Sequence, residues 1–170
     1  MAENGTITSN CLGMDSGIRS TMNDYVDDEL VRQLMADGNI RKLPAMVSAE
    51  AEEYLRSNFP LNTKMTTWIV DWNSIPFKFL HWAEANDDET LTWIDEVPGD
   101  RSLLGLLYFN SEQPCLVGSL EFLIKHLDEL VWKAPGNRLL FGVERKSDGG
   151  IVFKPRVIEF NGRGELRGSI

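Results

Sequence analysis

"LLGLLYFN" occupies residues 103–110 and decides the class of fold, because it is an almost unbroken apolar run of strand length. Strands that are apolar at nearly every position are typical of the buried interior of a sheet, whereas half-exposed strands alternate. The segment Glu112–Pro114 then ends the run. We therefore expect a central strand at residues 103–110.

The clearest helical pattern in the chain follows in "GSLEFLIKHLDELVWKAPGN", residues 118–137. Ser119 is suited to cap this helix, because its hydroxyl can accept a hydrogen bond from an amide of the first turn. Pro135–Gly136 ends the pattern. The sequence predicts one long packed helix over residues 119–132, whose apolar stripe is Leu120, Leu123, Ile124, Leu127, Leu130 and Val131.

The C-terminal segments read as a strand, a turn and a strand. "RLLFGVER" (residues 138–145) and "IVFKPRVIEF" (residues 151–160) flank the turn sequence "KSDGG". The pair Asn161–Gly162 is a strong indication of a second tight turn. We expect a short last strand through Leu166 to pair back.

The sequence of the N-terminal third predicts two helices after a flexible arm. Residues 1–20 are rich in Gly, Ser, Thr and Asn, and we expect them to form a flexible arm. A helix follows over residues 23–38, with Asn23 as its N-cap and Gly38 as its stop. A second helix is expected to begin at Ser48, whose hydroxyl would cap it.

The middle of the chain is the least regular part. Residues 66–72, "TTWIVDW", are β-branched and aromatic and predict a strand. Residues 77–85 are compatible with a strand or a short helix, and the preceding Pro76 favours the helix. Residues 90–97, "TLTWIDEV", alternate Leu91 and Trp93 on one face and predict another strand.

These expectations together predict the α+β class. The sheet is mostly antiparallel, one long helix packs on it, and a small helical part precedes it. We expect residues 21–170 to form a single domain after the arm. Residues 59–64 are the nearest candidate for an internal boundary.

The net charge of −9 over 170 residues is unevenly distributed. Residues 1–64 carry ten acids and six bases, residues 65–132 twelve acids and three bases, and residues 133–170 four acids and eight bases. An acidic middle repels nucleic-acid phosphates and attracts a basic protein. We therefore expect a basic protein partner and no nucleic-acid partner.

The remaining composition predicts a cytoplasmic protein. No apolar run reaches the roughly 18 residues of a membrane span, and the first residues lack the pattern of a secretory leader. The two cysteines, Cys11 and Cys115, form no CxxC pair, and we expect both to be free thiols in a reducing compartment.

No catalytic, cofactor-binding or metal-binding pattern stands out. The chain has no G-x-S-x-G, no Walker A and no G-x-G-x-x-G, and its acidic stretch lacks the alternation and the glycine of a calcium loop. We therefore predict no catalytic residue, no cofactor and no metal. A small hydrolase that uses Cys11 or a carboxylate pair stays open as an alternative.

The acidic charge concentrates in "HWAEANDDETLTWIDEVPGD", residues 81–100, which holds seven carboxylates and no Lys or Arg. Carboxylates steer a basic partner and aromatic rings anchor it. The sequence therefore predicts a partner-binding face made of Trp82, Glu84, Asp87, Asp88, Glu89, Trp93, Asp95 and Glu96.

Several interpretations of this stretch remain open. The simplest is a solvated face with no partner, and either tryptophan can be a surface or a core residue. The functional hypothesis is an inhibitor or immunity-type protein that masks a basic site on a toxin or nuclease. The other alternative is a regulatory or assembly domain that self-associates into a homo-oligomer, with the basic tail of one chain against the acidic block of another.

Overall fold

The computed structural model describes residues 29–64, 67–97, 103–131 and 136–170. Its strands are β1 (Ile40–Lys42), β2 (Phe77–His81), β3 (Leu104–Tyr108), β4 (Leu116–Ser119), β5 (Arg138–Arg145), β6 (Ile151–Phe160) and β7 (Glu165–Ser169). Its helices are α1 (Glu29–Ala36), α2 (Ala45–Asn58), the 3-10 turn η1 (Trp82–Glu84), α3 (Asp87–Glu96), α4 (Leu120–Lys125) and α5 (Leu127–Val131). No helix in these ranges is long and apolar enough to cross a membrane.

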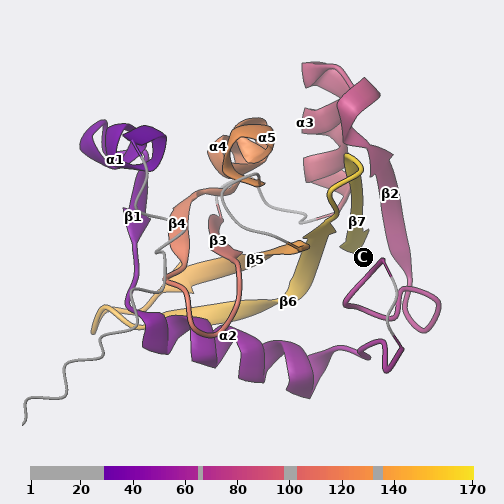
Figure 1. Ribbon diagram of the computed structural model, residues 1–170, viewed down its shortest axis with the longest axis horizontal. Coiled ribbons are helices and arrows are strands. Elements are labelled where there is room, and N and C mark those ends of the chain that lie inside the picture. The colour runs from indigo at the N-terminus through magenta and orange to yellow at the C-terminus, as the bar shows by residue number, and fades with distance from the viewer. Residues whose placement is uncertain (1–28, 65–66, 98–102, 132–135) are drawn as a thin grey trace, which may run out of the picture.

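The strands pair into one antiparallel sheet in the order β1-β4-β3-β5-β6-β7-β2 (Figure 1). β3 lies inside the sheet between β4 and β5, which confirms the predicted strand. Leu106 and Leu107 are successive residues of β3, and both are fully buried. They belong to core clusters on opposite faces of the sheet. The run is apolar at nearly every position because both faces are covered.

Helices cover the two faces of the sheet unequally. Figure 1 shows α1, α3, α4 and α5 over one face and α2 along the other. Leu123 and Ile124 of α4 and Leu127 of α5 are buried in the core cluster on the first of these faces. Ala51 and Leu55 of α2 belong to the second cluster. The class is α+β, as predicted.

The single long helix predicted over residues 119–132 is divided into two. α4 ends at Lys125 and α5 begins at Leu127, with His126 between them in a non-helical conformation. The predicted cap is confirmed, because the Ser119 hydroxyl accepts a hydrogen bond from the Phe122 amide at 3.1 Å. Trp132 lies outside the described residues.

Side-chain contacts of His126 mark the division. Its ring stacks on Phe122 of α4 at 4.3 Å, and its Nδ1 lies 2.8 Å from a carboxylate oxygen of Glu129 on α5. The buried stripe continues across the break, because Leu127 and Leu130 lie in the same core cluster as Leu123.

The C-terminal prediction is confirmed. β5 pairs with β6, and β6 pairs with β7. In the second turn, the side-chain oxygen of Asn161 accepts hydrogen bonds from the amides of Arg163 and Glu165 at 2.9 and 3.2 Å. Gly164, rather than Gly162, adopts the left-handed conformation of this turn, at φ +76°.

The N-terminal helices differ from the prediction at their starts. Gly38 follows α1 at φ +76°, as a stop residue should, while Asn23 and the arm at residues 1–20 lie outside the described residues. α2 begins at Ala45, so Ser48 is a residue inside the helix rather than its cap. Ser48 is buried, and its hydroxyl donates to the backbone oxygen of Gln113. A tertiary contact therefore replaces the expected capping bond.

Predictions for the middle of the chain were wrong. Residues 67–72 form no strand of the sheet, and only an isolated bridge joins Val70 to Leu61. Residues 77–81 form β2, which pairs with β7, where a helix was expected. Residues 87–96 form α3, where a strand was expected.

A buried carboxylate explains why the segment before β2 stays out of the sheet. Glu159 of β6 is fully buried. Its oxygens accept hydrogen bonds from the amides of Ile69 and Val70 at 2.5 and 3.0 Å, from the Trp72 indole at 2.9 Å and from the Asn137 side chain at 2.6 Å. The two amides therefore find a side-chain acceptor in place of a neighbouring strand.

The protonation of Glu159 reflects two opposed effects. Burial raises the pKa of this carboxyl, because the charged form loses its hydration. The hydrogen bonds from the side chains and amides around it favour the carboxylate and oppose that shift.

We expect Glu159→Gln to lower the free energy of unfolding by about 2–6 kcal/mol. The amide replaces one acceptor oxygen by a donor, so two buried N–H groups lose their acceptor at roughly 1–3 kcal/mol each. Urea unfolding followed by tryptophan fluorescence measures the change.

Glu144→Gln is the matched control. Glu144 also lies in the sheet, but its carboxylate is exposed and pairs with Lys154 at 2.5 Å, and such pairs contribute only about 0–1 kcal/mol. Equal urea midpoints for the two variants would contradict the structural role of Glu159.

Candidate functional site

α3 carries most of the predicted acidic face and is amphipathic. A capping box starts it: the Asn86 side chain accepts a hydrogen bond from the Glu89 amide at 2.9 Å, and the Glu89 carboxylate accepts one from the Asn86 amide at 3.0 Å. The inward positions recur every three to four residues and are buried: Thr90, Trp93, Ile94 and Val97. The carboxylates occupy the opposite side of the helix.

α3 packs closely on β7 because residue 168 is a glycine. A Cβ at Gly168 would lie 3.1 and 3.2 Å from two ring carbons of Trp93 and would overlap the Val97 side chain. At the C-terminal end of α3, Arg156 of β6 donates a hydrogen bond to the Val97 backbone oxygen. A cation at a helix C-terminus is favourable. The sheet therefore sets the orientation of the acidic face.

The exposed carboxylates of this face are Glu84, Asp88, Glu89, Asp95 and Glu96. Nothing is described of the Asp87 side chain. Glu96 forms an ion pair with Lys78 at 2.8 Å, and Glu84 lies 3.8 Å from Nδ1 of His81. Lys78 is the one Lys or Arg of the sequence between residues 65 and 100. A single lysine among these carboxylates leaves the face negative.

The two tryptophans of the predicted face occupy interior positions. Trp93 is only 5% exposed and belongs to the core cluster. Trp82 is partly buried and makes an edge-to-face contact with Phe160 at 5.8 Å. The exposed aromatic ring in this region is instead Phe79 of β2, at 48%.

A shallow depression of about 390 Å³ lies between α3 and β2, lined by Leu80, Asn86, Asp88, Glu89, Thr92, Trp93 and Glu96. β2 is the strand at one edge of the sheet, and it pairs with β7 on one side only (Figure 1). No strand in the described part of the chain pairs with its other side. Edge strands of this kind can accept an additional strand. An acidic helix and an open sheet edge therefore adjoin.

The thiol of Cys115 lies in the core and is not placed for catalysis. It is fully buried, its sulfur lies 3.1 Å from the Ser48 hydroxyl, and it forms no disulfide. Burial raises the pKa of this thiol to about 11. A protonated, buried thiol is a poor nucleophile. Cys11, the other candidate, lies outside the described residues.

Sequence reasoning missed a polar cluster between α2 and β3. Glu52 accepts a hydrogen bond from Arg56 at 2.6 Å and a longer one from the Tyr108 hydroxyl at 3.4 Å, beside a cavity of about 200 Å³. Hydrogen bonds from Ser111 and Arg56 lower the pKa of Glu52, and burial raises that of Tyr108. The spacing of Glu52 and Arg56 was readable from the sequence, whereas the approach of Tyr108 depends on the fold.

Metal chemistry has no visible site in the part of the chain that is described. No three His, Cys, Asp or Glu side chains in these ranges are arranged to hold an ion.

Comparisons with known proteins found no relative: no protein-family model matches the chain, and neither a curated protein nor a solved structure matches it significantly. The candidate site therefore stands on its geometry alone.

We expect Gly168→Ala to lower the free energy of unfolding by about 1–3 kcal/mol, because the added methyl overpacks the contact of β7 with α3. Gly162→Ala is the control, since a Cβ there meets nothing within 4 Å. Chemical denaturation measures both. Equal stability of the two variants would contradict the close packing of α3.

We expect Cys115 to react with a thiol reagent about 100-fold more slowly in the native protein than in the unfolded one near neutral pH, because its thiolate is scarce and its sulfur is covered. A Cys11→Ser variant isolates this thiol, and the absorbance of released nitrothiobenzoate follows the reaction. A native rate equal to the unfolded rate would overturn the assignment of Cys115 as a structural residue.

Proposed function

We propose that the chain is a small acidic cytoplasmic protein that acts by binding a basic protein through the exposed side of α3 and the adjoining strand β2. This contact surface, the acidic edge, consists of Lys78, Phe79, Glu84, Asp88, Glu89, Asp95 and Glu96. The observation that supports the proposal is the position of the carboxylates on and beside a helix that adjoins the edge strand β2, whose outer side is open in the described part of the chain. In its concrete form, the protein is an inhibitor or immunity-type protein that masks a basic site on a toxin or nuclease.

Charge gives the acidic edge its selectivity. Exposed carboxylates act over roughly a Debye length, about 8 Å at physiological salt and about 30 Å at 0.01 M. They accelerate the encounter with a basic surface and slow the encounter with a nucleic acid. The single ion pair with Lys78 offsets little of this field, because both of its side chains are about half exposed.

β2 supplies the short-range part of the contact. Its outer side offers backbone groups to a partner strand, and Phe79 offers an exposed ring. Phe79 alternates with Lys78 and Leu80, which face α3, so its ring projects from the other face of the edge strand. A partner strand paired along β2 would contact this ring and the carboxylates together, and Phe79 then takes the anchoring role that the sequence suggested for Trp82 and Trp93.

A second candidate function is self-association. β1, at the opposite edge of the sheet from β2, carries Arg41 and Lys42. A head-to-tail contact would place these cations against the acidic edge of the next copy, which gives a ring or an open filament. Sedimentation velocity at low and high salt tests this arrangement. The hydrolase alternative gains no support from Cys115, whose thiol is buried.

The decisive experiment measures association with a partner captured from the source cell and identified by mass spectrometry. The test variant is Glu84→Gln, Asp88→Asn, Glu96→Gln. We expect its association rate to fall about tenfold at low salt and to approach the parent rate at high salt, because these carboxylates act at long range. Stopped-flow fluorescence measures the rates.

The control variant is Asp37→Asn, Glu50→Gln, Glu112→Gln, which removes the same charge from exposed positions elsewhere. We expect less than about a twofold change, because these carboxylates lie away from the contact. If the association rate fell equally in both variants, the effect would come from the net charge of the protein and not from the acidic edge. An association rate indifferent to salt and to both variants would remove the acidic edge from the mechanism.

A further inference from the structure

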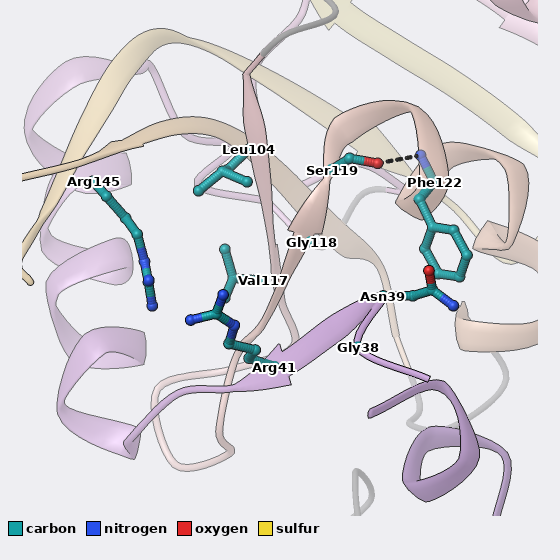
Figure 2. A pocket seen from close by; sticks show the side chains of 9 residues that line it. All are labelled: Gly38, Asn39, Arg41, Leu104, Val117, Gly118, Ser119, Phe122 and Arg145. Atoms are coloured by element: carbon teal, nitrogen blue, oxygen red, sulfur yellow. Dashed lines mark hydrogen bonds between the residues drawn. The ribbon is translucent and has the colours of Figure 1, made fainter. Parts of the chain in front are cut away.

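A cavity of about 320 Å³ lies at the other end of the sheet, where β1, β4, β3 and β5 run side by side (Figure 2). Val117 and Leu104 lie in its middle, from the adjacent strands β4 and β3. Arg41 of β1 and Arg145 of β5 lie on either side of them. The cavity is therefore an apolar floor between two cations.

The two arginine side chains converge. In Figure 2 the guanidinium groups of Arg41 and Arg145 extend toward one another over Val117 and Leu104. Arg41 is in register with Val117, so it projects from the same face of the sheet as this floor residue. Their approach is a product of strand order, because the two arginines are far apart in the sequence.

Neither guanidinium has an ion-pair or hydrogen-bond partner among the residues that the structure describes. Two other exposed arginines do pair: Arg32 lies 3.5 Å from Glu29, and Arg56 lies 2.6 Å from Glu52. A chain with 26 acids and 17 bases has carboxylates to spare. Two arginines that face each other without one are therefore a local excess of positive charge.

The lining of the cavity contains no carboxylate. Asn39 and Phe122 also line the cavity, on the side away from the two arginines, where Phe122 packs against the other core cluster. The nearest acid on β5, Glu144, pairs with Lys154 and, as the neighbour of Arg145 in the strand, points to the opposite face. An anion between the two guanidinium groups would relieve their mutual repulsion.

We propose that this cavity binds a small organic anion, in which a phosphate or carboxylate group is attached to an apolar body. Guanidinium groups bind such oxyanions through paired N–H donors, and two of them converge here. Leu104 and Val117, which lie beneath the two arginines, contact the apolar body. The volume is at the lower end of the roughly 300–1,000 Å³ typical of ligand pockets, which suits a small molecule. The site lies outside the acidic edge, and the proposal does not rest on the binding of a basic partner there.

Phenyl phosphate and benzoate are the probes, titrated into the whole protein by isothermal calorimetry in about 0.1 M chloride, a salt level that screens unspecific contacts. Phenol and inorganic phosphate each supply half of the proposed ligand. We expect saturable binding of phenyl phosphate or benzoate, at least about tenfold tighter than that of either half. A preference between the two probes assigns the oxyanion as phosphate or carboxylate.

The test variant is Arg41→Gln, Arg145→Gln, and the control is Arg32→Gln, Arg163→Gln, which removes the same charge from exposed positions outside the cavity. We expect the test variant to bind the probe at least about tenfold more weakly, and the control to stay within about twofold of the parent. Thermal unfolding of both variants verifies that they fold.

Amide chemical shifts locate the bound probe. We expect the largest shifts at Gly38, Gly118 and Ser119, which line the cavity, and none along α3. Absence of saturable binding, equal affinity in the test and control variants, or shifts spread over the surface would each overturn the proposal. None of these results bears on the acidic edge.

Discussion

The fold depends on where Glu159 finds its hydrogen-bond donors. A fully buried carboxylate is costly unless donors surround it, and most of those donors come from the segment between α2 and β2. The segment is thereby held against the sheet, with Trp72 in the core and 5.7 Å from Phe77. β2 begins at Phe77 and pairs with β7. The position of the outermost strand, and of α3 beside it, follows from this interior charge.

Segments with a strong local pattern were predictable from the sequence. β3, β5 and β6 are long apolar or β-branched runs, and the Ser119 cap is a contact within one helical turn. α3 was also readable, because its buried residues have helical spacing and Asn86 precedes Glu89 by three, but the alternation of Leu91 and Trp93 is equally typical of a strand. Residues 67–72 were not readable, because the acceptor of their amides lies about 90 residues further along the chain.

The candidate site was predictable only in its charges. Carboxylates stay exposed wherever the backbone goes, so the acidic residues of α3 lie on the surface as their type requires. The position of Trp93 depends on Gly168, a contact between α3 and β7 that no local pattern contains. The same limit applies to the exposure of Phe79 and to the approach of Arg41 and Arg145. These features depend on strand order, which the local patterns of the sequence do not specify.

The basic C-terminal segment gives less positive surface than its charge suggests, because the fold engages four of its eight cations. Arg138 is buried against the ring of Phe109, Arg167 lies over Trp68 and Phe77, Arg156 binds the end of α3, and Lys154 pairs with Glu144. Such cations add little to the field at the surface, so the exterior is more negative than the segment counts suggest. Arg145 escapes this because it is the last residue of β5, beyond Val143, where the pairing of β5 with β3 ends. The isolation of the Arg41–Arg145 pair is thus a consequence of the same packing that leaves the carboxylates of α3 in solvent.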